Sequence, residues 1–586
     1  MAQTTADILV DALVDWGIGV VFGIPGDGIN GIMEALRTRQ DRIRFVQVRH
    51  EEAAAFMACG YAKFTGRLGC CLGTSGPGAI HLLNGLYDAK LDGAPVLALT
   101  GQTYHDLVGT SYQQEVDLLT LFKDVAVYDE MVLGAGHARA LVDIACRTAL
   151  DRRGVAHITT PVDVQDQKLS DDERSKMMVY GHTSSAWRPP IVVPQESDLR
   201  AAAAVLKAGT RTAILAGQGA LGCAEELERI AELLGAPIVK ALLGKAAVPD
   251  DSPYTTGGIG LLGTRPSETV FEKCDTLLVV GSSFPYMNFL PDPGQARAVQ
   301  IDRDSTRIGL RYPVEVGLTG DSRATLQALI PLLQRREERR FLEDAQAGMR
   351  EWRELLRRQA SRDDMPMKPQ VVADRLNRLL ADDAIITTDS GTITTWAARH
   401  IDVRRGMQFS CSGNLATMAP GLPYAIAAQI AFPDRQVVAF VGDGGLTMLM
   451  GELATAAKYR LPITVVVIKN NTLGQIKWEQ MVFLGNPEYG VELHPIDFVK
   501  VAEACGAVGF HCEKPDEVQS TLDAALHTPG PALVEAVVDP YEPPMPAQVT
   551  PEQAFHLAEA LARGQPHRGR IALTIFRDKV RDLTGT

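Results

Sequence analysis

The residues of this sequence best suited to bind a metal ion are an aspartate and an asparagine that each follow an apolar stretch. Asp443 lies in segment 442–445, Gly-Asp-Gly-Gly, and Asn470 opens an Asn-Asn pair after the next apolar run. Carboxylate and amide oxygens are hard ligands that suit Mg²⁺, which proteins often bind together with phosphate oxygens. Glycines let the backbone approach a diphosphate closely. The pattern therefore predicts a site for Mg²⁺ and a diphosphate; two ordinary turns, Asp-Gly and Asn-Asn, are the alternative.

A second glycine-rich segment, residues 217–222, reads Gly-Gln-Gly-Ala-Leu-Gly between a strand-like run and a helical pattern. In that context G-x-G-x-x-G is a dinucleotide-binding fingerprint, because its glycines permit a tight turn and close approach to a pyrophosphate. A tight turn without a ligand is the alternative. Nothing else in the sequence indicates the hydride-acceptor site of an NAD-dependent dehydrogenase, so the segment does not favour that class of enzyme.

The elements that must position these segments alternate along the chain. Short aliphatic runs alternate with helical patterns such as 223–234, and the clearest runs are 46–48, 95–99, 212–216, 276–280, 437–441 and 463–468. This alternation predicts parallel α/β sheets, in which ligands bind beyond the carboxyl ends of strands. Breaks at 184–194 and 335–369 predict three domains and a tail: 1–185, 190–335, 366–545 and 546–586.

Composition narrows the class of protein further. The chain has 586 residues and a formal charge of −13, which argues against nucleic-acid binding. It has no apolar run of the roughly 18 residues that a membrane span needs, and its first residues do not resemble a signal peptide. Nine cysteines without a Cys-x-x-Cys pair favour reduced thiols over a disulfide framework or zinc cluster. We expect a cytoplasmic, multidomain enzyme.

Several segments together resemble the thiamine diphosphate-dependent pyruvate oxidases, also called pyruvate dehydrogenases (quinone), which are related to acetolactate synthases. The segments are 23–27, 49–58, 74–78, 413–423 and the two metal-site runs, and the resemblance covers essentially the whole chain. It implies three doubly wound parallel-sheet domains, binding in turn the thiamine pyrimidine, FAD and the thiamine diphosphate with Mg²⁺, followed by a helical tail. It also implies that Asp443, Asn470 and the carbonyl of Thr472 bind Mg²⁺.

The resemblance assigns further cofactor contacts. Glu51, in the segment Arg-His-Glu-Glu, would hydrogen-bond the aminopyrimidine of thiamine diphosphate and activate it. For Glu52, a stabilising negative charge at the N-terminus of a helix is a sufficient role. Met418 would support the bent cofactor, although alone it fits an ordinary core position. The residues assigned to thiamine diphosphate are Gly26, Ser390 (where most relatives carry Val), Gly391, Thr392, Met418, Gly442, Gly444 and Gly445. The residues assigned to FAD are Gly217, Gly219, Gly260, Gly263, Ser282, Phe284 and Asp302.

The resemblance also implies an activity, the oxidative decarboxylation of a 2-oxo acid. We expect pyruvate to give acetate and carbon dioxide, with electrons passing through FAD to a quinone or to oxygen. Glu479 stands where acetolactate synthases carry Trp, which favours the oxidase, and we assign Glu479 and Gln114 to the substrate. Gln113 and Gln475 replace phenylalanines, which predicts a more polar substrate pocket. The alternatives are a carboligase of the acetolactate synthase type with structural FAD, and a catalytically silent scaffold.

Two expectations concern partners. The resemblance implies a homodimer or homotetramer, in which the cofactor bridges the first domain of one subunit and the third domain of another, so that Glu51 and Asp443 face each other. The tail segment 568–581 is basic and amphipathic, and it resembles the segment that quinone-linked pyruvate oxidases use at the membrane surface. A helix packed on its own or a neighbouring subunit is the alternative.

Overall fold

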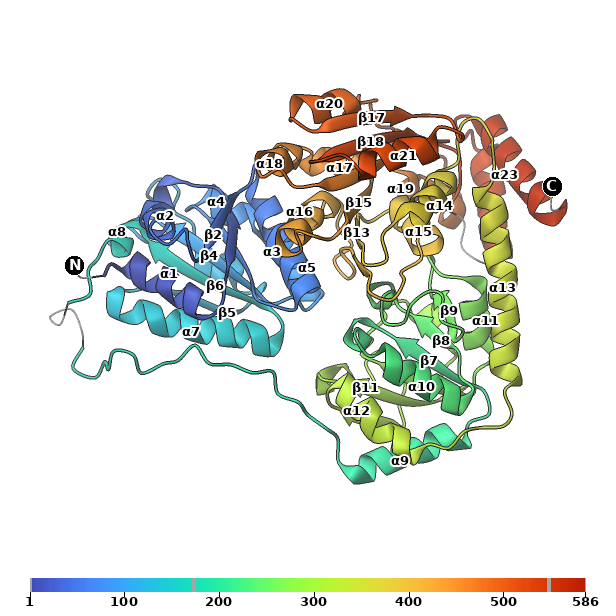
Figure 1. Ribbon diagram of the computed structural model, residues 1–586, viewed down its shortest axis with the longest axis horizontal. Helices are drawn as coiled ribbons and strands as arrows, with labels where there is room; N and C mark the ends of the chain where they lie inside the picture. The colour runs from blue at the N-terminus through green and yellow to red at the C-terminus, as the bar shows by residue number, and fades with distance from the viewer. Residues whose placement is uncertain (1–2, 171–174, 545–549, 585–586) are drawn as a thin grey trace.

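The computed structural model describes residues 3–170, 175–544 and 550–584. It contains three six-stranded sheets, each built from one stretch of the chain and flanked by helices (Figure 1). Neighbouring strands run parallel throughout the three sheets. The predicted fold class, three parallel α/β domains and a helical tail, is therefore confirmed, while the exact domain boundaries stay a prediction.

The first domain places the predicted activating glutamate at a helix start. Its strands are β1 (Val20–Gly23), β2 (Arg44–Gln47), β3 (Gly69–Gly73), β4 (Val96–Gln102), β5 (Ala126–Met131) and β6 (Val155–Pro161), in the sheet order β2-β1-β3-β4-β6-β5. Its helices are α1 (Thr5–Asp15), α2 (Asn30–Arg37), α3 (Glu51–Thr65), α4 (Pro77–His81), α5 (Leu83–Leu91), α6 (Leu118–Phe122), α7 (Ala135–Arg152) and α8 (Val162–Gln165). His50 caps α3 by accepting a hydrogen bond from the backbone amide of Glu52, and Gly66 ends α3 in a left-handed conformation. Glu51 therefore lies in the first turn of α3.

The second domain has the same architecture. Its strands are β7 (Thr212–Ala216), β8 (Ile238–Lys240), β9 (Thr255–Gly258), β10 (Thr276–Val280), β11 (Arg297–Asp302) and β12 (Val316–Thr319), in the order β12-β11-β10-β7-β8-β9. Its helices are α9 (Glu196–Ala208), α10 (Ala224–Leu234), α11 (Arg265–Lys273), α12 (Ser322–Leu329) and the long α13 (Arg340–Ala360). β7 and β10 coincide with predicted runs and are buried along their whole length. Such continuous aliphatic strands are typical of a parallel sheet covered on both faces.

The third domain brings the predicted metal ligands to one sheet edge. Its strands are β13 (Ile385–Thr388), β14 (Gln408–Ser410), β15 (Val437–Gly442), β16 (Ile463–Lys469), β17 (Val508–Cys512) and β18 (Ala532–Val537), in the order β14-β13-β15-β16-β18-β17. Its helices are α14 (Pro369–Leu379), α15 (Thr392–His400), α16 (Gly421–Ala431), α17 (Asp443–Leu449), α18 (Glu452–Lys458), α19 (Gly474–Trp478), α20 (Phe498–Ala504) and α21 (Val518–Leu526), and the tail forms α22 (Pro551–Ala562) and α23 (Arg568–Thr584). β15 and β16 pair directly, so Asp443 and Asn470 follow neighbouring strands.

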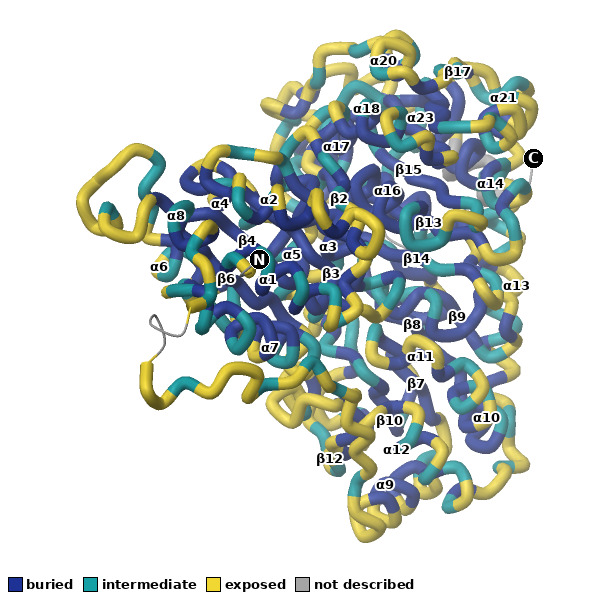
Figure 2. The backbone as a smooth tube through the Cα atoms, turned by 60° about the vertical axis from the view of Figure 1, so that its left-hand side comes forward, coloured by how far each residue is buried: buried dark blue, intermediate teal, exposed yellow. Residues whose placement is uncertain are grey.

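The first and third domains share one hydrophobic core. Helix α3 packs on α16, where a Cβ added to Gly60 would lie 2.9 Å from the ring of Tyr424. Figure 2 shows these packed helices as buried, whereas the connection from the first to the second domain is mostly exposed over residues 175–195. The first and third domains are therefore joined by packing, and a long exposed link connects the first domain to the second.

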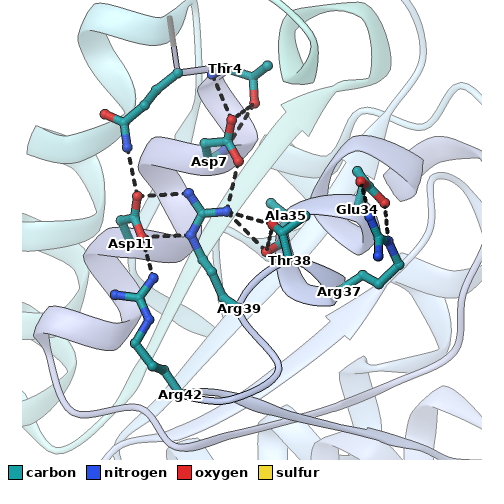
Figure 3. A network of polar contacts seen from close by, with 10 residues as sticks. Thr4, Asp7, Asp11, Glu34, Ala35, Arg37, Thr38, Arg39 and Arg42 are labelled. Carbon is teal, nitrogen blue, oxygen red and sulfur yellow. Dashed lines mark hydrogen bonds and ion pairs between the residues drawn. The ribbon is translucent and has the colours of Figure 1, made fainter. Parts of the chain in front are cut away.

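An arginine fixes α1 against the rest of the first domain (Figure 3). The Arg39 guanidinium donates to both carboxylate oxygens of Asp11, at 2.6 and 2.8 Å, and to Asp7 at 2.8 Å. The Arg39 side chain is only 11% exposed, while the nearby pair of Arg37 and Glu34 is largely exposed. The Arg39 network therefore contributes more to stability than an ordinary surface pair.

None of the helices formed by the described residues is both long and apolar enough to cross a membrane.

Candidate cofactor site

A cavity of about 1430 Å³ lies where the three domains meet. Its walls come from the loops after β13, β15 and β16 of the third domain, from the loops after β7, β10 and β11 of the second, and from the end of α5 in the first. Within each sheet the strands run parallel, so these loops follow their carboxyl ends, which is where parallel sheets bind ligands.

The metal end of the cavity is built around Asp443. One carboxylate oxygen of Asp443 accepts a hydrogen bond from the amide of Gly444 at 2.9 Å, and the other accepts from the amide of Asn471 at 2.6 Å. Asn470 Oδ1 accepts from the amide of Thr472 at 3.1 Å, so all three predicted metal ligands line one wall. Burial raises the pKa of Asp443 to about 6, and no ion pair involving it occurs among the described residues. A buried carboxylate without a cationic neighbour is costly, and a divalent cation would relieve that cost.

A second buried carboxylate, Asp389, lies beside the predicted diphosphate loop. Its Oδ1 accepts from the amide of Gly421 at 2.7 Å, while its Oδ2 has no partner among the described residues and touches Gly445. Burial raises the pKa of Asp389 to about 7. A partly protonated Asp389 would repel a diphosphate less than an ionised one. The sequence places further diphosphate contacts in the segment 389–392, of which Ser390, Gly391 and Thr392 were assigned to the cofactor, and all four residues line the cavity.

The predicted substrate residues of the third domain form a pair. Gln475 Nε2 donates a hydrogen bond to Glu479 Oε1 at 3.0 Å, and both side chains line the cavity beside Asn470. Glu479 begins a π-helical turn that runs to Phe483 and follows α19 directly. Such π-helical turns occur frequently at functional sites. Met418 lines the same region, and its Cε would lie 3.3 Å from a Cβ added to Gly444.

The tail packs behind this π-helical turn. Ala560 of α22 and Ile571 of α23 are fully buried in a cluster with Trp478 and Met481. Packing on its own chain, one of the two predicted roles of the tail, is therefore what the described part shows, while contact with a membrane stays a prediction. Several side chains of segment 568–581, including that of Phe576, lie outside the described residues.

The dinucleotide end of the cavity belongs to the second domain. Of the residues assigned to FAD, Gly219, Gly260, Ser282, Phe284 and Asp302 line it. Asp302 is the last residue of β11, where burial raises its pKa and its Oδ1 accepts a hydrogen bond from the amide of Asp304. A strand-end carboxylate with its second oxygen still available suits a ribose hydroxyl. The cavity is continuous from Asp302 to Asp443.

Gly217 and Gly263 do not line the cavity. A Cβ at Gly217 would collide with the backbone of Gly281, and one at Gly263 would lie 2.7 Å from the carbonyl of Gly258. At both positions glycine allows two loops to pack closely, because a larger residue would meet backbone atoms. Their contact with FAD stays a prediction.

Three other predicted residues, Gly26, Glu51 and Gln114, also lie away from this cavity. They lie near one another in the first domain, and Glu51 is buried in the first turn of α3. Gly26 packs on Thr74, whereas Gln114 accepts a hydrogen bond from Ser75 at 3.0 Å. The sequence predicted one site, and within one chain its residues form two clusters.

His81 is a site residue that the sequence analysis missed. Its Nδ1 lies 3.0 Å from Glu51 Oε2, its ring stacks on His50 with centroids 4.6 Å apart, and its side chain is 43% exposed. A histidine hydrogen-bonded to a carboxylate can orient it and exchange protons with it. The feature of the sequence that could have pointed to His81 is its position one helical turn after the Gly-Pro-Gly loop at 76–78.

Comparison with known proteins identifies the family. Three domain families of thiamine pyrophosphate (thiamine diphosphate) enzymes match the chain: the N-terminal TPP binding domain over residues 3–121, the central domain over 199–329 and the C-terminal TPP binding domain over 389–536. The chain belongs to the thiamine pyrophosphate enzyme family. Of the two clusters in this thiamine pyrophosphate enzyme, that of Glu51 lies in the N-terminal match and that of Asp443 in the C-terminal match.

Several relatives of this thiamine pyrophosphate enzyme cover nearly its whole length. A Bacillus subtilis protein, YdaP, provisionally described as thiamine pyrophosphate-containing, is 42% identical over 94% of each chain. The pyruvate oxidase of Lactiplantibacillus plantarum is 33% identical, over 92% of this chain and 89% of its own. The chloroplastic acetolactate synthase of Arabidopsis thaliana is 32% identical, over 92% of this chain and 82% of its own. The resemblance to both oxidase and synthase is therefore confirmed.

Proposed function

We propose that the protein oxidises a 2-oxo acid with thiamine diphosphate, Mg²⁺ and FAD: pyruvate and water give acetate and carbon dioxide, and two electrons pass to a quinone. The observation that carries this proposal is the single cavity that joins the Asp443 wall to the dinucleotide fingerprint of the second domain. A flavin bound at that fingerprint would have an open path to the thiamine end, which a redox reaction between two cofactors requires.

The residues of the third domain would hold the cofactor and its metal. Asp443, Asn470 and the carbonyl of Thr472 are the oxygen donors for Mg²⁺, and the glycines beside Asp443 leave room for the diphosphate. Bound thiamine diphosphate supplies the electron sink that makes decarboxylation of a 2-oxo acid feasible. Glu51 would hold a proton at the aminopyrimidine, and His81 would keep the Glu51 carboxylate oriented toward it.

Glu479 and Gln475 would act on the substrate side. The amide of Gln475 fixes one carboxylate oxygen of Glu479 and leaves the other available for a proton. A carboxyl group held in this way can serve as a general acid or base while the substrate reacts. Gln114, fixed by Ser75, would contribute an amide from the first domain.

The separation of the two clusters supports a site shared between two copies of the chain. Large apolar side chains are exposed around the first-domain cluster: Ile80 lies next to His81, and Tyr104 and Tyr112 stack edge-on near Gln114. Exposed apolar groups of this kind are typical of interaction surfaces. We infer at least a homodimer, in which Glu51 of one copy serves the cofactor held by Asp443 of the other.

A carboligase of the acetolactate synthase type is the second candidate, because synthases are about as similar to this chain as the oxidase is. An anaerobic absorbance spectrum of the protein with thiamine diphosphate, Mg²⁺ and FAD separates the two. Bleaching of the flavin on addition of pyruvate is expected for the oxidase. A flavin that stays oxidised while carbon dioxide is released would overturn the proposal in favour of the carboligase.

A flavin that stays oxidised without release of carbon dioxide would contradict pyruvate as the substrate. A 2-oxo acid with a polar side chain, such as hydroxypyruvate, would then be tested in the same experiment, because Gln475 makes this wall of the cavity polar. The electron acceptor is tested by adding a soluble quinone to the reduced protein and following the return of oxidised flavin.

A further inference from the structure

A buried aspartate, Asp92, lies at the point where the three domains meet. It follows the last residue of α5, its side chain is fully buried, and it lines the cavity. Its Oδ1 accepts hydrogen bonds from the backbone amide and the side-chain amide of Asn414, both at 2.8 Å, and its Oδ2 accepts from the amide of Gly413 at 2.9 Å. A residue of the first domain thus holds a loop of the third.

The same residue also holds the second domain. Its backbone carbonyl accepts a hydrogen bond from Gln218 Nε2 at 3.0 Å. Gln218 is the second residue of the dinucleotide fingerprint, between Gly217 and Gly219. Asp92 therefore contacts the loop assigned to FAD and the loop that leads to Met418, the residue assigned to the thiamine cofactor.

Asp92 is kept charged and fixed by Lys63 of α3. Lys63 Nζ donates to Asp92 Oδ2 at 2.7 Å, to the carbonyl of Cys411 at 2.9 Å and to the hydroxyl of Tyr424 at 2.7 Å. Burial by itself would raise the pKa of Asp92, but attraction to Lys63 and the hydrogen bonds to its carboxylate outweigh burial and lower it. The carboxylate is thus a rigid acceptor with every oxygen occupied.

A second contact joins the same two loops directly. Gly413 packs on the side chain of Leu243, which belongs to the second domain next to the fingerprint loop. A Cβ added to Gly244, the next residue, would lie 2.5 Å from the carbonyl of Ala216, at the end of β7. Segments 216–219, 243–244 and 411–414 therefore form one packed unit around Asp92.

We propose that Asp92 couples the two cofactor sites, so that FAD and thiamine diphosphate bind cooperatively. This inference rests on the proposed function, since it needs both cofactors. Because Asp92 holds both loops in one packed unit, a shift of either loop on cofactor binding is transmitted to the other, so the second cofactor meets a loop already in its bound position. Asp92 is a positioning residue here, because it acts through the loops that it holds.

The test measures FAD affinity by flavin fluorescence on cofactor-free protein, with and without saturating thiamine diphosphate and Mg²⁺. In the unchanged protein we expect thiamine diphosphate and Mg²⁺ to tighten FAD binding by at least about fivefold. Gln218→Ala removes the side chain that donates to the Asp92 carbonyl and should bring this ratio close to one. Asn414→Ala removes one of three hydrogen bonds between its loop and the Asp92 carboxylate and should lower the ratio only in part. Because the readout is a ratio, a direct loss of contact with FAD cancels out of it.

Matched controls remove similar bonds elsewhere. Gln346→Ala deletes an amide that donates to the carbonyl of Pro253, and Asn377→Ala deletes one that donates to Asp402. Both should keep the ratio of the unchanged protein, and the double variant of Gln218 and Asn414 should lower it no further than Gln218→Ala alone. A ratio of one in the unchanged protein, or a ratio that Gln218→Ala leaves intact, would overturn the coupling alone. Failure of the unchanged protein to bind FAD at all would instead overturn the proposed function and the coupling together.

Discussion

The two clusters of predicted site residues differ in what surrounds them. The third-domain cluster, which includes Asp443 and Glu479, lines a cavity that it shares with the second domain. The first-domain cluster, Glu51 with His81 and Gln114, lies outside that cavity and is bordered by exposed apolar side chains. One cluster has the features of a binding site for a charged cofactor, and the other has the features of an interaction surface beside a buried carboxylate. We infer that binding and activation of the cofactor are separable functions of two surfaces.

The largest expected effect separates activation from binding. Glu51→Gln removes the ionisable group but keeps the shape, so the rate should fall by about a thousandfold while affinity for thiamine diphosphate stays within a few-fold. Exchange of the cofactor C2 proton, followed by NMR, and calorimetric titration measure the two quantities. Glu52→Gln is the neighbouring control, because the Glu52 side chain accepts a hydrogen bond from Asn84, and among the described residues it forms no ion pair. A large loss of cofactor affinity in Glu51→Gln would break the distinction between the clusters.

The opposite pattern is expected at the metal end. Asp443→Asn should weaken binding of thiamine diphosphate with Mg²⁺ by at least about a hundredfold, since even outer-shell changes at metal sites cost 10–100-fold. Calorimetric titration at several Mg²⁺ concentrations measures the loss, and the exposed Asp434→Asn serves as the control. Unchanged cofactor affinity in Asp443→Asn would remove Asp443 from the metal site.

The placement of Asp443 beside Asn470 could be predicted from sequence. The strands before them, β15 and β16, are long buried runs, and neighbouring parallel strands end at the same edge of a sheet. Glu479 and Gln475 are four residues apart, a spacing at which helical side chains meet. Asp92 and Lys63 could not be predicted, since several of their partners belong to other domains. His81 and Glu51 lie 30 positions apart and meet only when the first domain folds. The separation of Glu51 from Asp443 within one chain followed only from the family resemblance, because local patterns do not encode domain packing.

A third prediction concerns how the stability of the protein depends on pH through Asp389, the buried carboxylate beside the predicted diphosphate loop. Burial raises the pKa of Asp389 to about 7, so the folded protein holds a proton there that the unfolded chain has lost. This contribution to stability is therefore present at low pH and is lost as the pH rises through about 7. As the pH rises from 5 to 7, the free energy of unfolding of the cofactor-free protein should fall by about 2–3 kcal/mol relative to that of Asp389→Asn. Thermal unfolding at both pH values checks this, and a constant difference between the two proteins would contradict it.

The smallest expected effect concerns the first domain alone. Arg39→Ala should lower the free energy of unfolding by about 1–2 kcal/mol, between the values for buried and exposed ion pairs, because it leaves Asp7 and Asp11 without their shared cation. Arg37→Ala, which breaks an exposed pair, should cost less than about 0.5 kcal/mol. Urea unfolding measures both changes, and FAD affinity should remain as it was. Equal losses in the two variants would contradict the difference in burial.

The most direct test of the shared site combines the two inactive variants in one assembly. Glu51→Gln and Asp443→Asn subunits carrying different tags are produced together, and assemblies that contain both are isolated. If Glu51 of one copy serves the cofactor of the other, each mixed dimer keeps one complete site, and roughly a quarter to a half of the wild-type activity should return. Activity no higher than that of the two variants measured separately would contradict the account, because it would place Glu51 and Asp443 in the same chain's site.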